Sequence, residues 1–160
     1  MSRLVLASQS ESRRAMLAAA GVPHDAVAAR VDEASAKESL LARGITPRDL
    51  ADALAELKAL KVSRTDPGAL VLGCDSVVAL DDGDLLDKPG SRDEAAEHLR
   101  RLSGRVHDLY SAAVIAEGGH AVWRHVDRAR LHVRTLSEDF IAAYLDAEWP
   151  AVGGLSLIHI

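Results

Sequence analysis

Three serines and a pair of arginines follow a short apolar run near the N-terminus, in the stretch LVLASQSESRRAML. Ser8, Ser10 and Ser12 supply hydroxyl groups, and Arg13 opens the arginine pair as a helical pattern begins. A helix N-terminus offers free backbone N–H groups and the positive end of the helix dipole, so hydroxyls and a guanidinium at this turn could bind a phosphate. Helix capping with solvent-exposed arginines explains the same residues and is the commoner arrangement.

Two carboxylate positions could complete such a site. Asp75 lies inside the apolar run VLGCDSVVAL. A carboxylate there must be paired, metal-bound or at a strand end, because burying it alone is costly. Hydrogen bonds from neighbouring backbone N–H groups would explain Asp75 equally well. Asp32 and Glu33 form an acidic pair that is usually solvated, although one of them could share a divalent metal with Asp75.

The basic side chains that could neutralise a phosphate are two helical lysines and one loop lysine. Lys58 and Lys61 both border the buried side of one predicted helix, and helical periodicity does not choose between them. Lysines at such positions usually extend their ammonium groups to solvent. Lys88 precedes Pro89 between a hairpin and a capped helix, which is a rigid place for a cation but also an ordinary loop. Cys74 is interpreted as a small core residue, because nothing in the sequence supplies a nucleophile with a partner.

Composition and missing motifs exclude several protein classes. Hydrophobic residues make up 48% of the 160 residues and charged residues 27%, which fits one folded domain. The net charge of −5 argues against a nucleic-acid binder, and no apolar run predicts a membrane span or a signal peptide. The single cysteine excludes an internal disulfide and suits a reducing cytosol. Dinucleotide-binding glycine motifs, a P-loop, a GxSxG elbow and zinc-binding histidine spacings are all missing.

Alternating strand and helix patterns predict that these residues are held in a single α/β domain with a mixed sheet. The predicted strands are 4–7, 26–31, 69–80 with an interruption near 73–75, 105–116, and one or two within 121–135. The predicted helices are 11–20, one from Thr46-Pro47, one from Ser91 to near Gly104, and one from Ser137 to about Ala147.

Capping and turn residues set these boundaries. Ser10 is a candidate N-cap of the first helix, although Ser8 with Glu11 also fits a capping box. Asp82-Gly83 predicts a hairpin, and Gly118-Gly119 predicts a turn. One face of the helix that starts at Thr46 is expected to be buried, and it is marked by Leu50, Leu54 and Leu57.

Taken in order, these motifs resemble those of the Maf family of nucleoside triphosphate pyrophosphatases. LASQSESRR resembles the family's N-terminal LAS-x-S-x-x-R motif, and VDE resembles its acidic motif. ALAELKA is similar to the helix that ends in Lys-Ala, and GCDSVV is similar to the G-A-D-T-x-V strand. DKPGSRDEAAEHLRRLSGRVHDLYSAAVI is similar to the family's Lys-Pro motif, helix, Leu-Ser-Gly stop and following strand. The match is collinear over nearly the whole chain.

The resemblance implies a Maf/ITPase-like α/β single domain, with a twisted mixed sheet flanked by helices, in residues 1–154. It implies a cytoplasmic, usually homodimeric enzyme that cleaves a nucleoside triphosphate into the monophosphate and pyrophosphate. It further implies a divalent metal cofactor, Mg²⁺ or alternatively Mn²⁺, held by Glu33 and Asp75, with Asp75 as the catalytic base. The substrate-binding residues that it implies are Ser8, Ser10, Ser12, Arg13, Lys58, Ser76 and Lys88.

Two departures from the family pattern, at Ser12 and Ser76, concern the substrate, and a further one lies at Val152. Ser12 stands where the dTTP/UTP branch has arginine and the 7-methyl-GTP branch has tryptophan, and Ser76 replaces the threonine or glutamine of those branches. Val152 stands where many members have lysine. The resemblance therefore leaves dTTP, UTP and modified nucleotides open as substrates.

The C-terminal end departs from the family as well. Members continue past the Gly153-Gly154 pair through a strand, a loop and a last helix, a region that contributes a glutamine to the site. We expect residues 155–160, LSLIHI, to be a non-native tail, with a naturally short variant as the alternative. Two other hypotheses stay open: a non-enzymatic nucleotide-binding regulator of cell division, and a catalytically inactive fragment of the enzyme.

Overall fold

The computed structural model describes residues 2–152, with side chains described as far as residue 149. The expected non-native tail, 155–160, lies outside the described residues. Two compact units make up the chain: Met1–Ser76 with Tyr110–Asp127, and Val77–Leu109 with Arg128–Ile160. They are called the first and the second unit below, and each is described by itself. No helix in the described part of the chain is long and apolar enough to cross a membrane.

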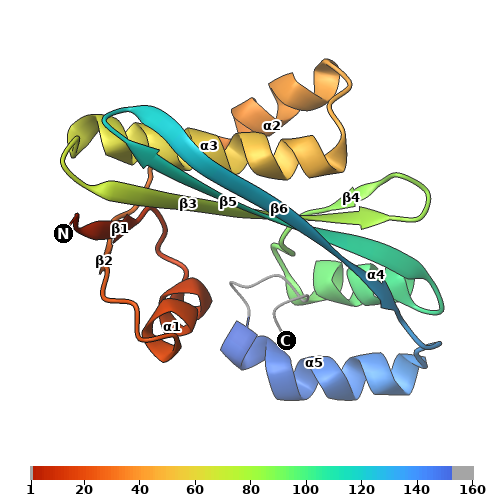
Figure 1. Ribbon diagram of the computed structural model, residues 1–160. Coiled ribbons are helices and arrows are strands. Elements are labelled where there is room, and N and C mark those ends of the chain that lie inside the picture. The colour runs from red at the N-terminus through yellow and green to blue at the C-terminus, as the bar shows by residue number, and fades with distance from the viewer. Residues whose placement is uncertain (1, 153–160) are drawn as a thin grey trace. The chain divides into compact units, whose positions relative to one another are not determined.

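A mixed sheet runs in the order β2-β1-β3-β5-β6, with β4 paired to β3 (Figure 1). β1 is parallel to both β2 and β3, whereas β3 and β4 are antiparallel. The sheet is therefore mixed, as the sequence predicts. Its strands are β1 (Leu4–Leu6), β2 (Asp25–Ala26), β3 (Leu70–Leu80), β4 (Leu85–Leu86), β5 (Val106–Glu117) and β6 (His120–His132).

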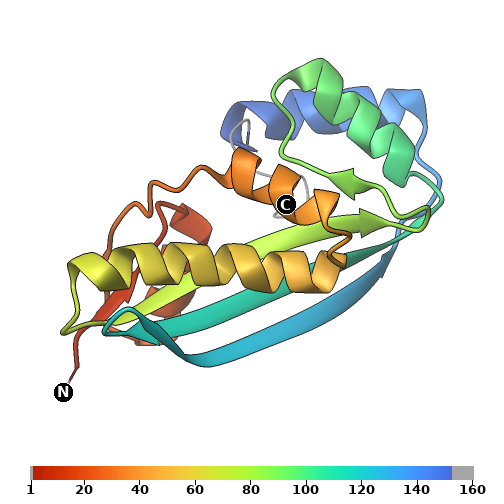
Figure 2. The same ribbon diagram turned by 90° about the horizontal axis from the view of Figure 1, so that it is seen from above.

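Three helices accompany the strands of the first unit: α1 (Glu11–Ala19), α2 (Glu33–Ala42) and α3 (Pro47–Thr65). α3 lies along one face of the sheet and buries Leu50 and Leu54, while α1 lies on the other side (Figures 1 and 2). A cluster of small aliphatic residues joins β1, α3 and β3, and it consists of Val5, Ala7, Val62, Ala69 and Val71. The packed face of α3 therefore fixes the position of its buried side chains against the strands.

The second unit contains α4 (Arg92–Leu102) and α5 (Glu138–Val152), which pack on each other. Their shared core is aliphatic and consists of Ala95, Leu99, Ile141 and Leu145. The β3–β4 hairpin turns at Gly83, whose φ of +92° suits a glycine. Arg105 binds both Asp81 and Asp82 beside this turn, which ties the hairpin to the start of β5.

Local capping predictions are confirmed. The hydroxyls of Ser10, Thr46, Ser91 and Ser137 each accept a hydrogen bond from the backbone N–H three residues on. Ser10, not Ser8, is therefore the N-cap of α1. The predicted hairpin at Asp82-Gly83 and the turn at Gly118-Gly119 are also present.

Three strand and helix boundaries differ from the prediction. The strand predicted at 26–31 is wrong, because β2 ends at Ala26 and residue 33 already begins a helix that the sequence analysis did not predict. The predicted break in 69–80 is also wrong: β3 is continuous, since Gly73 packs tightly and Asp75 finds a partner. The last helix extends to Val152, beyond the expected end at Ala147.

One predicted core position is wrong as well. Leu57 is 37% exposed, because the buried stripe of α3 instead passes through Leu50, Leu54 and Lys58 at four-residue spacing. A lysine thus occupies a core position. Its buried ammonium group requires a charged or hydrogen-bonding partner inside the fold.

Candidate active site

Lys58 joins two carboxylates inside the first unit. Its Nζ lies 2.9 Å from Asp75 Oδ1 and 2.6 Å from Glu33 Oε1. Lys58 and Asp75 are each only 7% exposed, whereas half of the Glu33 side chain reaches solvent. The ammonium also donates to the Cys74 carbonyl at 3.4 Å. Of the two lysines that periodicity left open, packing therefore selects Lys58 for the buried position.

The close approach of α3 to β3 makes this pairing possible. A Cβ at Gly73 would lie 2.2 Å from the Ala55 carbonyl oxygen and 2.7 Å from the Ala59 nitrogen, so only glycine fits. Alternation along β3 places Asp75 on the same face as Gly73. Lys58 precedes Ala59 on the helix turn that touches Gly73, and it therefore meets Asp75 directly.

Burial and neighbouring charges set the protonation of Asp75 in opposite directions. Desolvation raises the pKa of the Asp75 carboxyl, and this is the largest effect. Lys58 lowers that pKa through its charge and hydrogen bond, Glu33 raises it, and Arg13 lowers it. The net pKa is above the ordinary value of an aspartate, so this carboxylate is a better proton acceptor than a solvent-exposed one.

The serine-rich turn between β1 and α1 is organised by its own hydroxyls. Ser8 Oγ accepts from the Ser10 N–H at 3.1 Å, and Ser10 Oγ accepts from the Arg13 N–H at 3.4 Å. Ser10 Oγ and Ser12 Oγ lie 3.0 Å apart. These half-buried hydroxyls hold one another at the N-terminus of α1, where the helix dipole favours an anion.

Arg13 gives this turn its free positive charge. Its charge lowers the pKa values of Asp75 and Cys74, so the guanidinium is electrostatically coupled to the middle of β3. Burial nevertheless keeps the pKa of the Cys74 thiol raised, which agrees with the interpretation of this cysteine as an inert core residue. Among residues 2–149, Arg13 forms no ion pair. Its guanidinium is therefore available to a ligand.

A hollow of about 230 Å³ opens beside the Lys58 cluster. It is lined by Ala7–Gln9 after β1, by Ala28–Val31 before α2, and by Glu33 and Lys58. Of the predicted site residues, Ser8, Glu33 and Lys58 line this hollow directly, and Asp75 joins them through Lys58. Gln9 and residues 28–30 also line the hollow but carry no predicted site role, because Gln9 is a variable position of its motif and residues 28–30 read as part of a strand.

Three predicted residues have a different status. Asp32 caps α2 by accepting from the Ser35 N–H and hydroxyl, at 3.1 and 2.8 Å, so of the acidic pair only Glu33 faces Lys58. Ser76 follows Asp75 on β3 and is half-buried. Lys88 is exposed after β4 in the second unit. The substrate-binding roles of Ser76 and Lys88 stay predictions.

Glu33 and Asp75 supply carboxylate oxygens of the kind that a divalent metal prefers. Glu33 and Asp75 converge on one ammonium, so their oxygens lie within reach of a common cation. Magnesium is usually held by one or two carboxylates together with substrate phosphates, and this pair fits that pattern. Within the described residues, no group of three or more His, Cys, Asp or Glu side chains is placed to hold a metal by itself.

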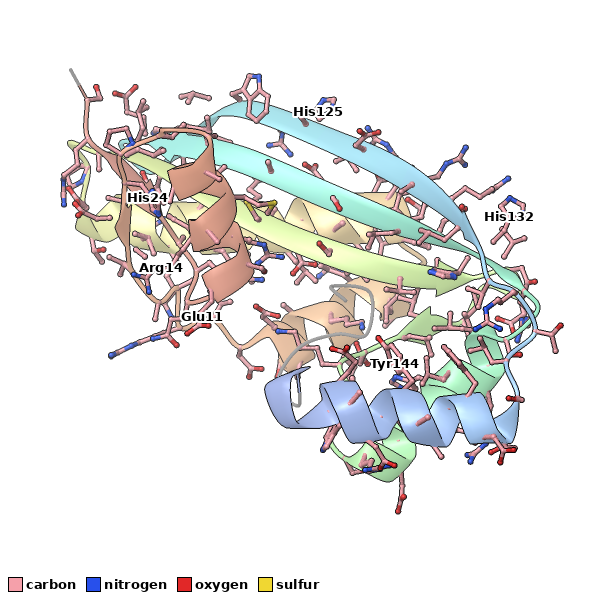
Figure 3. All side chains as sticks on the ribbon, turned by 90° about the horizontal axis from the view of Figure 1, so that it is seen from below. Glu11, Arg14, His24, His125, His132 and Tyr144 are labelled. Carbon is pink, nitrogen blue, oxygen red and sulfur yellow. The ribbon has the colours of Figure 1, made fainter. Side chains whose placement is uncertain are left out.

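Two histidines of the first unit, His24 and His125, lie apart from each other. Figure 3 shows His24 beside β2 and His125 on β6, at separate places in the first unit. His24 Nδ1 lies 3.0 Å from the Val22 carbonyl, and His125 stacks on Trp123. Both rings thus have local structural partners, which agrees with the scattered histidines of the sequence.

Comparisons with known proteins match this chain over most of its length. A family model described as Maf-like protein matches residues 3–159. A nucleoside triphosphate pyrophosphatase from Sphingopyxis alaskensis is 52% identical over 149 residues, which cover 93% of this chain and 75% of the relative. A 7-methyl-GTP pyrophosphatase from Mesorhizobium japonicum is 46% identical over 143 residues, covering 89% of this chain and 71% of the relative.

A solved structure shares the fold at much lower identity. The HAM1 protein from Coxiella burnetii superposes with a TM-score of 0.54 and 15% identity, covering 81% of this chain and 71% of the other. At that identity the likeness concerns the arrangement of strands and helices alone.

Proposed function

The chain belongs to the family of Maf-like proteins, and from this premise we propose that it is a pyrophosphatase that hydrolyses a nucleoside triphosphate to the monophosphate and pyrophosphate. The observation that carries the proposal is the buried pair of Asp75 and Lys58 beside the hollow. A carboxylate with a raised pKa can accept a proton from water, which a simple nucleotide-binding protein does not require.

In the proposed reaction, the triphosphate binds at the turn before α1. Its oxygens accept hydrogen bonds from the free N–H groups of the helix and from the hydroxyls of Ser8, Ser10 and Ser12. Arg13 and Lys58 neutralise its negative charge. A phosphate contact by Lys88, which the sequence resemblance implies, stays a prediction. Positioning and charge neutralisation of this kind supply most of the catalysis in phosphoryl transfer.

Asp75 acts as the general base. It orients a water molecule and accepts one of its protons as the water oxygen attacks the α-phosphorus. The bond between the α-phosphorus and the oxygen that bridges to the β-phosphorus breaks, and pyrophosphate leaves with the electron pair. Lys58 keeps the Asp75 carboxylate ionised and fixes its orientation.

A divalent metal, Mg²⁺ with Mn²⁺ as the alternative, would be held by Glu33 and Asp75 together with phosphate oxygens. When bound, it supplies charge neutralisation on the phosphate oxygens. Cytoplasmic location and a homodimeric state, which the sequence resemblance implies, stay predictions.

The base of the substrate is open between dTTP, UTP and a modified nucleotide. Ser12 and Ser76 are the positions proposed to distinguish these substrates, because their residue types depart from both branches of the family. The name of the Mesorhizobium japonicum relative adds 7-methyl-GTP to the nucleotides that an assay should contain.

The experiment is a pyrophosphate-release assay over a nucleotide panel, with Mg²⁺ or Mn²⁺ and with chelator. We expect metal-dependent turnover by the wild type and loss of turnover by Asp75→Asn, with nucleotide binding retained. Normal turnover by Asp75→Asn would overturn the role of that carboxylate. Binding without turnover by the wild type would favour the non-enzymatic regulator or the inactive fragment, and an extended chain with a family-like C-terminus would separate those two.

A further inference from the structure

We propose that Arg30 is a specificity-determining residue that contacts the base of the nucleotide and selects bases with a keto group over those with an amino group. The inference rests on the proposed function, because it concerns the substrate of the same hollow. Arg30 has no role in the reaction described above, and no sequence motif contains it.

The backbone of Arg30 is the first observation. Its φ is +51°, and no other non-glycine residue in the part of the chain that the structure describes has a positive φ. An arginine has no local reason to adopt this left-handed conformation, since its Cβ is disfavoured there. Strain of this kind persists only where surrounding contacts enforce it, and it gathers at functional sites.

A specific contact holds the backbone of Arg30 in place. Lys61 Nζ donates to the Arg30 carbonyl from α3, while Lys58 binds Glu33 from the preceding turn of the same helix. The two lysines are separated by about 4.5 Å along the helix axis. α3 therefore holds the segment from Arg30 to Glu33 at both of its ends.

The surroundings of Arg30 favour a base over a phosphate. Arg30 lines the hollow together with Ala28, Ala29 and Val31, whose small apolar side chains suit a planar ring. A volume of about 230 Å³ is below the range of about 300–1,000 Å³ typical of sites for whole ligands. The hollow thus accommodates one part of a nucleotide. Ser8 and Lys58 also line it, so the phosphates would enter from the turn that ends at Arg13, while the base would lie against residues 28–31.

The guanidinium is available for recognition. Arg30 forms no ion pair with any side chain in residues 2–149, whereas Arg3, Arg124 and other surface arginines are paired with carboxylates. A guanidinium only donates hydrogen bonds. It can therefore bind the keto oxygen of a base but not the amino group that replaces it, and this difference is the chemical origin of the proposed selectivity.

The test compares matched nucleotide pairs that differ in this one group: ITP with ATP, and UTP with CTP. We expect the wild type to favour the keto member of each pair in kcat/KM. Arg30→Gly should reduce both ratios by about tenfold, chiefly by lowering kcat/KM for ITP and UTP. Glycine accepts the positive φ without strain, so this variant removes the side chain while keeping the loop. Arg30→Lys should retain only part of the preference, and Arg43→Ala, an exposed arginine outside the hollow, should match the wild type.

Lys61→Met tests the hydrogen bond from Lys61 to the Arg30 carbonyl. We expect it to lower the same two ratios less than Arg30→Gly does, and to have no further effect when combined with Arg30→Gly. A general structural effect of Lys61 would instead persist in the double variant.

Binding separates this inference from the proposed function. Dissociation constants for the four nucleotides are measured in the Asp75→Asn background, where no turnover is expected. Equal loss of affinity for all four nucleotides in Arg30→Gly, or unchanged ratios, would overturn the base contact while leaving the pyrophosphatase intact. Keto-selective binding that depends on Arg30, without turnover by the wild type, would support the contact and overturn the proposed function.

Discussion

Lys58 Nζ and Asp75 Oδ1 lie 2.9 Å apart, and the two residues, on α3 and β3, are 17 positions apart in the sequence. Both residues are more than nine-tenths buried. The pair links the stability of the first unit to the proposed chemistry, because the same carboxylate that needs Lys58 for its burial is the proposed base.

Lys58→Met should destabilise the fold. It leaves the Asp75 carboxylate buried without its main partner, and breaking a buried pair on one side typically costs about 3–5 kcal/mol. Unfolding by denaturant, followed by circular dichroism, measures this change. The double variant Lys58→Met/Asp75→Asn should recover much of the loss, because the uncompensated charge is gone. Wild-type stability of the single variant would contradict the importance of the pair.

Gly73→Ala should disrupt the packing of α3 on β3. Its Cβ would meet backbone atoms of Ala55 and Ala59 at 2.2 and 2.7 Å, so we expect a loss in the free energy of unfolding of about 2 kcal/mol or more. Gly68→Ala is the matched control, since nothing lies within 4 Å of its Cβ position. Equal melting temperatures for the two variants would show that the helix adjusts freely.

As pH is lowered, kcat/KM should fall at a higher pH than it would if the catalytic base were an aspartate of ordinary pKa. Asp75 must be ionised to accept a proton, and burial raises its pKa above the usual 3.8. Glu33→Gln should move the acid limb of the kcat/KM profile to lower pH, because the Glu33 charge raises the Asp75 pKa. Arg13→Gln should move it to higher pH, because the Arg13 charge lowers that pKa. Shifts in the same direction would contradict the assignment.

The Asp75 carboxyl should also make the stability of the fold depend on pH, in the opposite direction to activity. Because the pKa of Asp75 is higher in the folded than in the unfolded state, the folded state binds more protons between the two pKa values. Its contribution to stability is therefore present at low pH and is lost as pH rises through the folded pKa. Comparing unfolding free energies of the wild type and Asp75→Asn across this window isolates the effect, which should be missing in the variant.

Removal of divalent metal should abolish turnover without unfolding the chain. Glu33 is half exposed and Asp75 is already compensated by Lys58, so the fold does not depend on a cation at this place. Activity and melting temperature are measured with chelator and again after Mg²⁺ is added back at constant ionic strength. Full activity in chelator would contradict the metal requirement, and unfolding in chelator would contradict the structural independence.

The elements that the sequence predicted well are those encoded by neighbouring residues. Ser10, Thr46 and Ser91 each cap a helix, because their hydroxyls accept from the backbone N–H three residues later. Gly83 forms the turn of the hairpin. Such contacts depend on local spacing alone. Asp32 caps α2 in the same way, but the apolar pattern of residues 26–31 predicts a strand before it and no helix after it.

The details of the site depend on contacts between distant segments. Periodicity placed Lys58 and Lys61 at one side of α3, and only the close packing at Gly73 decides which of them is buried. The left-handed backbone at Arg30 could not be predicted either, because an arginine gives no indication of a positive φ. Residues near the hollow that carried motifs could be predicted, whereas those held by tertiary contacts could not.

The mutual dependence of Lys58 and Asp75 has a consequence for how such proteins diverge. In a lineage that no longer needs the activity, losing Lys58 first would leave a buried, unpaired carboxylate and lower the stability of the fold, so the lysine tends to persist as long as Asp75 does. The presence of this lysine and aspartate in a homologue is therefore weak proof of catalysis. Ser8 and Arg13 are the better record of whether selection still maintains the enzyme. Ser8 is half-buried and Arg13 has no ion pair among residues 2–149, so the fold can lose either more easily.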